Sequence, residues 1–230
     1  MRLAKIFFLI LISSFFTYGQ ESESTIQNWF DFSSSHTFDE RWKVYGDVGY
    51  RIIIGDDILN RFYIRPAGSM KLSDVITLHV GFGLFASFVD NRTIWETRPF
   101  QGIEVNWPVI FSLPLTNYIR FEERFFSKNT SNTFVFRWRY QLGTRIWLDK
   151  TKTENLFYIP LQLEWFANYN RDFEFLANEF RAITGLGYTL DKSWRFEINT
   201  ILQNSQASVD EIYNFYDVIF RFRIFKEFNL

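Results

Sequence analysis

A period-two alternation of apolar and polar side chains runs along almost the whole chain, and it constrains the fold more than any other feature. Between residues 133 and 148, for example, Phe134, Phe136 and Trp138 alternate with polar residues that include Arg137 and Arg139. Successive side chains of a β-strand point to opposite faces, so this pattern predicts strands with one apolar and one polar face. The alternation recurs in segments 26–35, 42–54, 59–72, 75–88, 118–126, 156–166, 179–190, 194–202 and 213–230, and less cleanly in 93–107.

The length of these segments indicates where such strands belong. They run about ten to fifteen residues, which suits tilted strands that cross a bilayer core of roughly 30 Å. Strands of soluble proteins are shorter, usually about five or six residues. A sheet exposed to lipid has to close, because an open edge would leave backbone groups without hydrogen bonds in hydrocarbon. The sequence therefore predicts an all-β fold: a transmembrane, up-and-down, antiparallel β-barrel.

The number of strands is harder to fix. About eleven segments can be counted, whereas single-chain bacterial barrels usually have an even number of strands. Ten strands result if segment 26–35 is not a full strand, and twelve if a further strand lies near residues 168–178. We expect ten to twelve strands and favour twelve.

The N-terminus has the layout of a secretory signal peptide. Arg2 and Lys5 precede an apolar stretch over residues 6–16, and small residues follow up to Gly19. We predict a signal peptide over residues 1–19, cleaved after Gly19, and a barrel domain over residues 20–230. The alternative is an N-terminal membrane anchor, but the apolar stretch is short for a span and has no stop-transfer flank. Because the chain has no Cys, a lipoprotein anchor, disulfides and thiolate metal sites are excluded.

The composition limits which classes of molecule the protein is expected to bind. The chain carries 25 basic and 26 acidic side chains, so it lacks the basic excess of proteins that wrap nucleic acid. It also has 29 Phe and 8 Trp residues while 22% of its residues are charged. A wall with one face in lipid and the other in a polar lumen has use for both kinds of side chain. We expect the lipid bilayer with its lipopolysaccharide, the outer-membrane insertion machinery and other outer-membrane proteins as partners, and an integral location in the outer membrane.

The polar face is rich in Arg and Glu. In a small barrel such side chains fill the interior and pair across neighbouring strands. The alternative is a pore or cavity for anions, but ten to twelve strands leave little open width, so a plugged lumen is favoured. The predicted lumen-lining charged network comprises Arg51, Arg61, Arg65, Arg120, Glu122, Arg124, Arg137, Arg139, Arg145, Glu164, Glu179, Arg181, Arg195, Glu197, Arg221 and Arg223.

Connections between the segments alternate in character along the chain. We assign the shorter ones, near residues 37–40, 73–74, 108–114, 149–154 and 191–192, to the periplasm, and the more polar ones to the cell surface. Trp42, Trp107 and Trp194 lie on the apolar phase near the first set, so we predict an aromatic girdle there. The apolar C-terminal segment, which ends at Leu230, is typical of strands read by the insertion machinery.

Signals for catalysis and for metal or cofactor binding are weak. The chain has two His residues, His36 and His79, and neither is accompanied by a Ser nucleophile motif. The acidic pairs 56–57 and 210–211 supply too few oxygens for a calcium site. No phosphate-binding loop, zinc spacing or dinucleotide fingerprint occurs. We therefore predict no catalytic residue, no cofactor and no metal.

Several short motifs together resemble a known group. They are Trp29-Phe30, Arg61–Pro66, Gly81–Gly83, Glu96–Gly102, Arg120–Phe125, Phe136–Tyr140, Asn178–Arg181 and Gly185–Tyr188. This pattern resembles an uncharacterised family of outer-membrane barrel proteins of Gram-negative bacteria, classed as a domain of unknown function. The resemblance implies a barrel and an outer-membrane location, and it assigns no catalytic residue.

Three functional hypotheses remain. The leading one is a non-enzymatic barrel that serves as a structural or accessory component of the outer membrane, within a larger complex. The second is a narrow channel or carrier for small anionic or amphipathic solutes. The third is a barrel hydrolase that acts on lipid, which rests on His36 and His79 alone.

Overall fold

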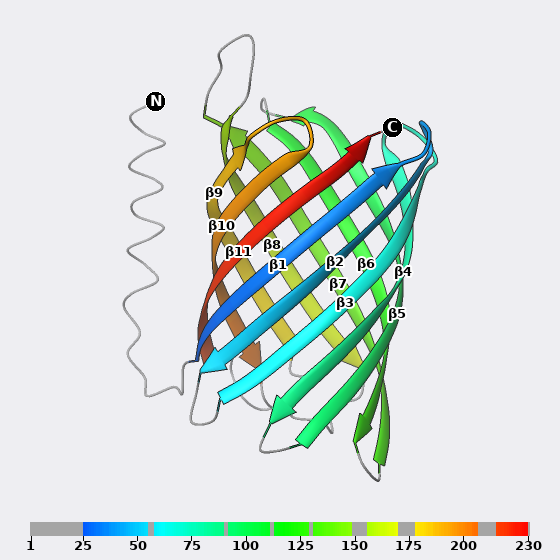
Figure 1. Cartoon of the computed structure of the whole chain (residues 1–230). Coiled ribbons are helices and arrows are strands. Elements are labelled where there is room, and N and C mark those ends of the chain that lie inside the picture. The colour runs from blue at the N-terminus through cyan, green and yellow to red at the C-terminus, as the bar shows by residue number, and fades with distance from the viewer. Residues whose placement is uncertain are drawn as a thin grey trace.

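The computed structural model describes residues 25–54, 58–89, 92–110, 113–128, 131–148, 156–169, 178–206 and 215–229, and the predicted signal peptide over residues 1–19 lies outside them. Within these ranges eleven strands form one closed barrel (Figure 1). The strands are β1 (Ile26–Thr37), β2 (Trp42–Ile54), β3 (Ile58–Lys71), β4 (Ile76–Val89), β5 (Arg92–Ile110), β6 (Leu113–Lys128), β7 (Ser131–Trp147), β8 (Phe157–Tyr169), β9 (Asn178–Thr189), β10 (Trp194–Gln206) and β11 (Phe215–Asn229). No helix in the described ranges is long and apolar enough to span a membrane.

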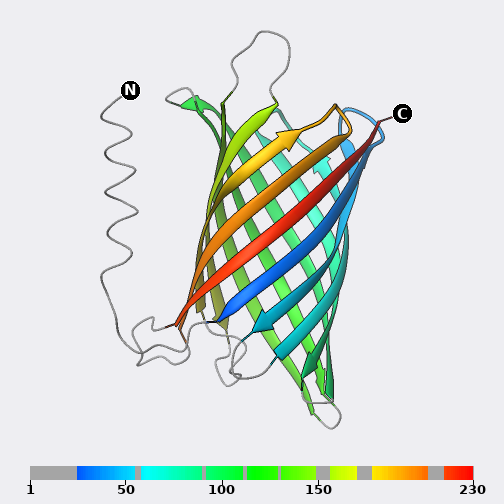
Figure 2. The same cartoon turned by 60° about the vertical axis from the view of Figure 1, so that its left-hand side comes forward.

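Each strand pairs with the next one along the chain in antiparallel fashion, so the predicted up-and-down barrel is confirmed. The circuit closes where β1 pairs with β11 in parallel, with Ile26 opposite Val218 and His36 opposite Phe228. Figures 1 and 2 show both strands pointing towards the end of the barrel where the C-terminus lies. We call this parallel pair the seam.

Eleven strands fall inside the expected range of ten to twelve but on neither even number. β1 pairs along its whole length with β2 on one side and β11 on the other, so it is a full strand of the wall. Of the segment considered for a further strand, residues 170–177 lie outside the described ranges. An odd count makes the first and last strands run in the same direction, and a parallel ladder satisfies their edges as an antiparallel one would.

The alternation seen in the sequence separates two faces of the wall. On β6, Arg120, Glu122 and Arg124 point inward and are buried, whereas Ile119 and Phe125 point outward and are nearly half exposed. The other strands follow the same rule, with apolar side chains outward and most charged ones inward. The polar core of this protein therefore lies inside the barrel, and its apolar surface lies outside.

Strand β5 explains why segment 93–107 fits the alternation poorly. Its outward face carries Trp95, Ile103 and Trp107, which are about half exposed, but Gln101 also points outward. Its register to β6 shifts between Trp107 and Ile110. The segment is nevertheless a continuous strand of 19 residues, the longest in the barrel.

The three Trp residues predicted as a girdle lie at one end of the barrel. Trp42 begins β2, Trp194 begins β10, and Trp107 lies near the end of β5, which runs in the opposite direction to those two strands. Trp42 and Trp107 are half exposed on the outer face. Trp194 stacks on Phe196 and has the ammonium group of Lys226 above its ring. This end is also the C-terminal end of the barrel (Figure 1).

Candidate functional site

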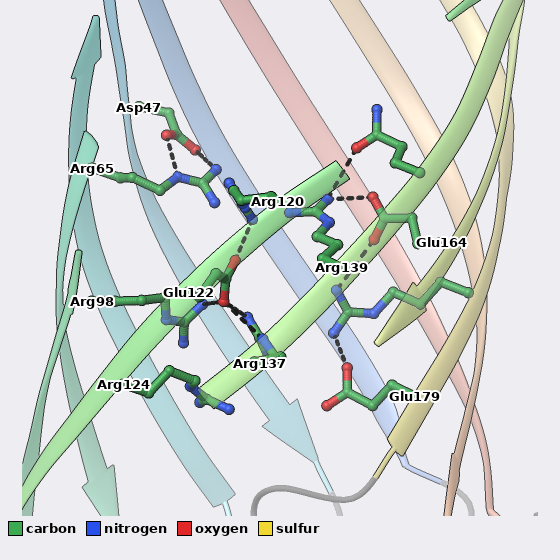
Figure 3. A network of polar contacts seen from close by, with 12 residues as sticks. Asp47, Arg65, Arg98, Arg120, Glu122, Arg124, Arg137, Arg139, Glu164 and Glu179 are labelled. Carbon is green, nitrogen blue, oxygen red and sulfur yellow. Dashed lines mark hydrogen bonds and ion pairs between the residues drawn. The ribbon is translucent and has the colours of Figure 1, made fainter. Parts of the chain in front are cut away.

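The centre of the lumen is organised around Glu122, whose side chain is fully buried. Its Oε1 lies 2.7 Å from Arg120 Nη2, and its Oε2 lies 2.5 Å from Arg137 Nη2. Arg98 approaches the same Oε2 at 3.5 Å. Figure 3 shows these three guanidinium groups, from strands β5, β6 and β7, converging on the one carboxylate.

Glu96 extends this cluster along β5. Its Oε1 lies 2.6 Å from Arg98 Nη2 and 2.6 Å from Arg124 Nε. Arg98 thus bridges Glu96 and Glu122. We call Glu96, Arg98, Arg120, Glu122, Arg124 and Arg137 the Glu122 cluster; all six side chains are at most 8% exposed. Removing any one of these charges would leave its partner buried and unpaired, which is strongly destabilising.

A second cluster lies on β7, β8 and β9. Arg139 forms an ion pair with Glu164, and Arg181 lies 3.6 Å from the other oxygen of that carboxylate. Arg181 also pairs with Glu179 at 2.6 Å. Gln162 donates a further hydrogen bond to Glu164. The planar guanidinium fork suits this role, since one Arg can donate to two carboxylates at once.

A third cluster holds the region beside the seam. Arg65 donates to both oxygens of Asp47, at 2.8 and 2.6 Å, and Arg221 pairs with Asp31. The buried Tyr63 hydroxyl lies between the two carboxylates, 2.5 Å from Asp31 Oδ1 and 3.0 Å from Asp47 Oδ2. This cluster therefore joins β1, β2, β3 and β11 through side chains as well as through backbone hydrogen bonds.

A fourth cluster lies nearer the C-terminal end of the barrel. The carboxylate of Glu197 accepts a hydrogen bond of 2.7 Å from the Tyr158 hydroxyl. Arg223 lies 3.3 Å from its other oxygen, and Arg195 lies 4.0 Å from the first.

Aromatic rings fill the spaces between these charges. The guanidinium of Arg51 lies 3.8 Å from the ring centroid of Trp29, and that of Arg98 lies 4.0 Å from the Phe85 centroid. Trp29 also packs in an apolar cluster with Ile183, Ile201 and Ile219 inside the barrel. Stacking on rings gives Arg side chains a favourable contact that leaves their edges free to donate hydrogen bonds.

All sixteen residues of the predicted lumen network lie on the inward phase of their strands. Most are joined by the contacts above, but three Arg residues have no carboxylate within ion-pair distance among the described residues. Arg61 donates to Ser87 at 2.8 Å, Arg51 stacks on Trp29, and Arg145, which is exposed, lies over the Tyr158 ring.

Sequence reasoning missed four members of the network, Asp31, Asp47, Glu96 and Arg98. Asp31 and Asp47 share the inward phase of predicted Arg51, so the parity of their strands was sufficient to find them. Glu96 and Arg98 lie on β5, where the alternation is diluted.

A cavity of about 380 Å³ opens at the C-terminal end of the lumen. Its lining includes Lys43, Tyr45, Lys71, His79 and Glu104. The Tyr45 hydroxyl and His79 Nδ1 are 2.8 Å apart, and His79 Nε2 is 3.8 Å from Glu104 Oε2. These polar side chains therefore face open space at one end of the lumen.

The two His residues do not form a joint site. His79 points into the lumen from β4, whereas His36 lies on the outward phase of β1 with Nδ1 2.9 Å from the Phe228 carbonyl oxygen. In the described ranges, no group of three or more His, Asp or Glu residues has the geometry to hold a metal ion. The acidic pairs at 56–57 and 210–211 lie outside those ranges.

Comparison with known proteins identifies the family. A family model described as "Protein of unknown function (DUF2490)" matches residues 26–214. The chain belongs to the DUF2490 family. The predicted resemblance to an uncharacterised family is thereby confirmed. No curated protein matches this DUF2490 chain in sequence.

Three solved structures are similar to this DUF2490 chain at low identity. The KdgM porin is 15% identical, with a TM-score of 0.45 over 78% of this chain and 90% of that one. The KdgM porin in complex with disordered oligogalacturonate has the same identity and coverage, with a TM-score of 0.46. The anion-selective porin from Comamonas acidovorans is 12% identical, with a TM-score of 0.37 over 76% of this chain and 54% of that one.

Proposed function

We propose that the protein is an integral outer-membrane barrel with a closed lumen, and that it serves as a non-enzymatic structural or accessory component of that membrane. The burial of the Glu122 cluster carries this proposal. A water-filled channel would expose its lining, whereas these six charged side chains are almost without contact with solvent. Salt bridges across neighbouring strands are then the plug of the lumen.

Support for the membrane location comes from the outer face. Among the described residues, thirty-six large apolar side chains are exposed, most of them on the outward phase of the strands, and they include the rim residues Trp42 and Trp107. A soluble protein rarely leaves so much contiguous apolar surface uncovered. Cell fractionation tests this part of the proposal. The protein is expected to sediment with the outer membrane and to resist alkaline carbonate extraction; release into the supernatant would contradict it.

Planar-bilayer recording tests the closed lumen. We expect the wild-type protein to give no conductance steps at any voltage or salt concentration. A fourfold variant, Glu96→Ser, Arg98→Ser, Glu122→Ser and Arg137→Ser, removes two acidic and two basic side chains and so leaves the net lumen charge unchanged. Because it replaces four large side chains by small ones, it is expected to conduct. Stable conductance of the wild type would overturn the proposal whether or not the variant folds.

The second candidate, a narrow channel or carrier for small anionic or amphipathic solutes, is favoured by a different observation. Arg51, Arg61 and Arg145 have no carboxylate partner in the described lumen, and a cavity opens at the C-terminal end of that lumen. The same recordings distinguish the two functions. Wild-type currents whose reversal potential follows the chloride gradient would select the channel.

A further inference from the structure

In the described strands, one acidic side chain points outward away from the strand ends. Glu123 follows Glu122 on β6 and pairs in register with Phe136 of β7, on the outward phase. It lies five residues from the end of β6, further inside than Ser127, which pairs with the exposed Trp95. Among the described residues, Glu123 has no ion-pair or hydrogen-bond partner.

Aromatic rings lie beside this carboxylate on β6 and β7, while its outward neighbours on β5 include Thr97 and Gln101, which pair with Phe125 and Phe121. Phe121 stacks on Phe136 with ring centroids 5.2 Å apart and meets Trp138 edge-on at 4.8 Å. Phe134 meets Phe136 edge-on at 4.5 Å and lies 4.7 Å from Phe125. We call Phe121, Glu123, Phe125, Phe134, Phe136 and Trp138 the Glu123 face. Trp138 is 54% exposed, so the face is open on its outer side.

A carboxylate in this position is unfavourable in lipid alone. Ionisable side chains facing hydrocarbon are rare, because they lose hydration without gaining a partner, and those that occur usually mark a functional contact. Mutually packed rings offer a rigid surface of the kind enriched at protein interfaces. The Glu123 face thus has packed rings on β6 and β7 and a carboxylate beside them. Among the described residues, no basic group pairs with that carboxylate.

We propose that the Glu123 face binds a second membrane protein, which presents a Lys or Arg side chain to Glu123 at the same depth in the bilayer. This inference rests on the proposed accessory function and names the site through which it would act. Charge complementarity selects a basic group, and the packed rings select a protein surface over a lipid headgroup.

A second copy of this chain does not fit. On the outward face of the described strands, the basic residue is Lys226, which lies beside Trp194 at the opposite rim. Two copies inserted in the same direction would hold Lys226 and Glu123 at different depths. The partner is therefore a different protein.

Site-specific photocrosslinking in intact outer membranes tests this contact. A photoreactive residue is placed at Phe121 or at Trp138, and as a control at Ile198, which is 63% exposed on β10. We expect one protein adduct from positions 121 and 138 and none from 198. Glu123→Gln and Glu123→Lys should lower the adduct yield at least about tenfold, as loss of a desolvated charge pair requires.

Exchanging the charges of Glu123 and its partner residue then tests whether the two form an ion pair. Mass spectrometry of the adduct identifies the partner's basic residue nearest the crosslink, and its change to Glu should abolish the adduct with the wild type and restore it with Glu123→Lys. Adducts with lipid only, or a yield that Glu123→Lys leaves unchanged, would overturn the proposal. Unchanged heat-modifiable migration of the Glu123 variants excludes misfolding. Conductance of the wild type would refute the closed lumen without affecting this result.

Discussion

Glu122 and Glu123 are neighbours in β6, yet the two faces of the wall treat them in opposite ways. Glu122 is fully buried in the lumen and has Arg98, Arg120 and Arg137 around it. Glu123 points outward and has the aromatic rings of β6 and β7 beside it. Most charged side chains of the lumen face pair within the chain, whereas Glu123 on the outer face has no ion-pair partner among the described residues. One step along a strand therefore separates a carboxylate held by three guanidinium groups from one that has no partner among the described residues.

The largest expected effect comes from removing these carboxylates one at a time. In the purified protein, Glu122→Ala leaves three buried guanidinium groups without their shared partner, which should lower the free energy of unfolding by about 3–5 kcal/mol. Glu123→Ala removes an unpaired carboxylate from an apolar face and should leave that free energy unchanged or raise it. Urea titration in detergent, followed by Trp fluorescence, measures both. Equal losses of stability in the two variants would contradict the proposed difference between the lumen face and the outer face.

Glycines on the two faces provide a second comparison. A Cβ at Gly81, inside the barrel, would lie 2.3 Å from the Phe100 ring, whereas one at Gly68, outside, would meet nothing closer than 4.0 Å. Gly81→Ala should therefore destabilise by about 1–3 kcal/mol through overpacking. Gly68→Ala should be neutral or stabilising, since it only restricts the unfolded chain. The same urea titrations apply, and a costly Gly68→Ala would show that the outer face is packed as tightly as the lumen.

Tyrosine hydroxyls sharpen the comparison for hydrogen bonds. Tyr63 is buried and donates to Asp31 and Asp47, whereas Tyr140 is exposed on the outer face and donates to Asn117. We expect Tyr63→Phe to cost about 1.5–3 kcal/mol, because its acceptors are charged and lose a buried donor. Tyr140→Phe should cost about 0.5 kcal/mol. The contrast fails if the second variant is the less stable of the two.

The smallest effect is expected at a carboxylate outside both faces. Asp39, in the turn between β1 and β2, accepts hydrogen bonds of 2.7 Å from the backbone N–H groups of Arg41 and Trp42, which lower its pKa. Its contribution to stability is fully present above the ordinary pKa of about 3.9 and is lost as the pH falls through the lower folded-state pKa. Asp39→Asn should thus be less stable than the wild type at pH 7 and equal to it at pH 2. A gap that persists in acid would assign the effect to something other than the charge.

The alternation was sufficient to predict the faces of the wall, because it depends on local strand geometry alone. It placed Arg137 and Glu164 inward and Trp42 outward, as the structure does. It could not say which Arg meets which carboxylate, because that depends on the stagger between strands. Arg98 of β5 reaches Glu122 of β6 for this reason. Where Pro99, Gln101 and Gly102 interrupt the pattern of β5, two central members of the network were overlooked.

The strand count depends on the most distant contact in the chain. Ile26 pairs with Val218, and neither segment has a sequence pattern that predicts a parallel partner. Because bacterial barrels usually have an even number of strands, ten or twelve strands were expected. Closure at the seam requires only that the backbone groups of both edge strands form hydrogen bonds, which eleven strands also allow. The segments could be counted from the sequence, but the parallel pairing of the first and last strands could not be predicted from it.

The seam also determines on which side of the membrane each end of the barrel chain lies. Because β1 and β11 run in the same direction, the start of the first strand and the end of the last open on opposite sides of the membrane that the barrel would span. An even-stranded barrel returns its chain to the side from which it came. Here a peptide attached before Ile26 and one attached after Asn229 would face different aqueous phases.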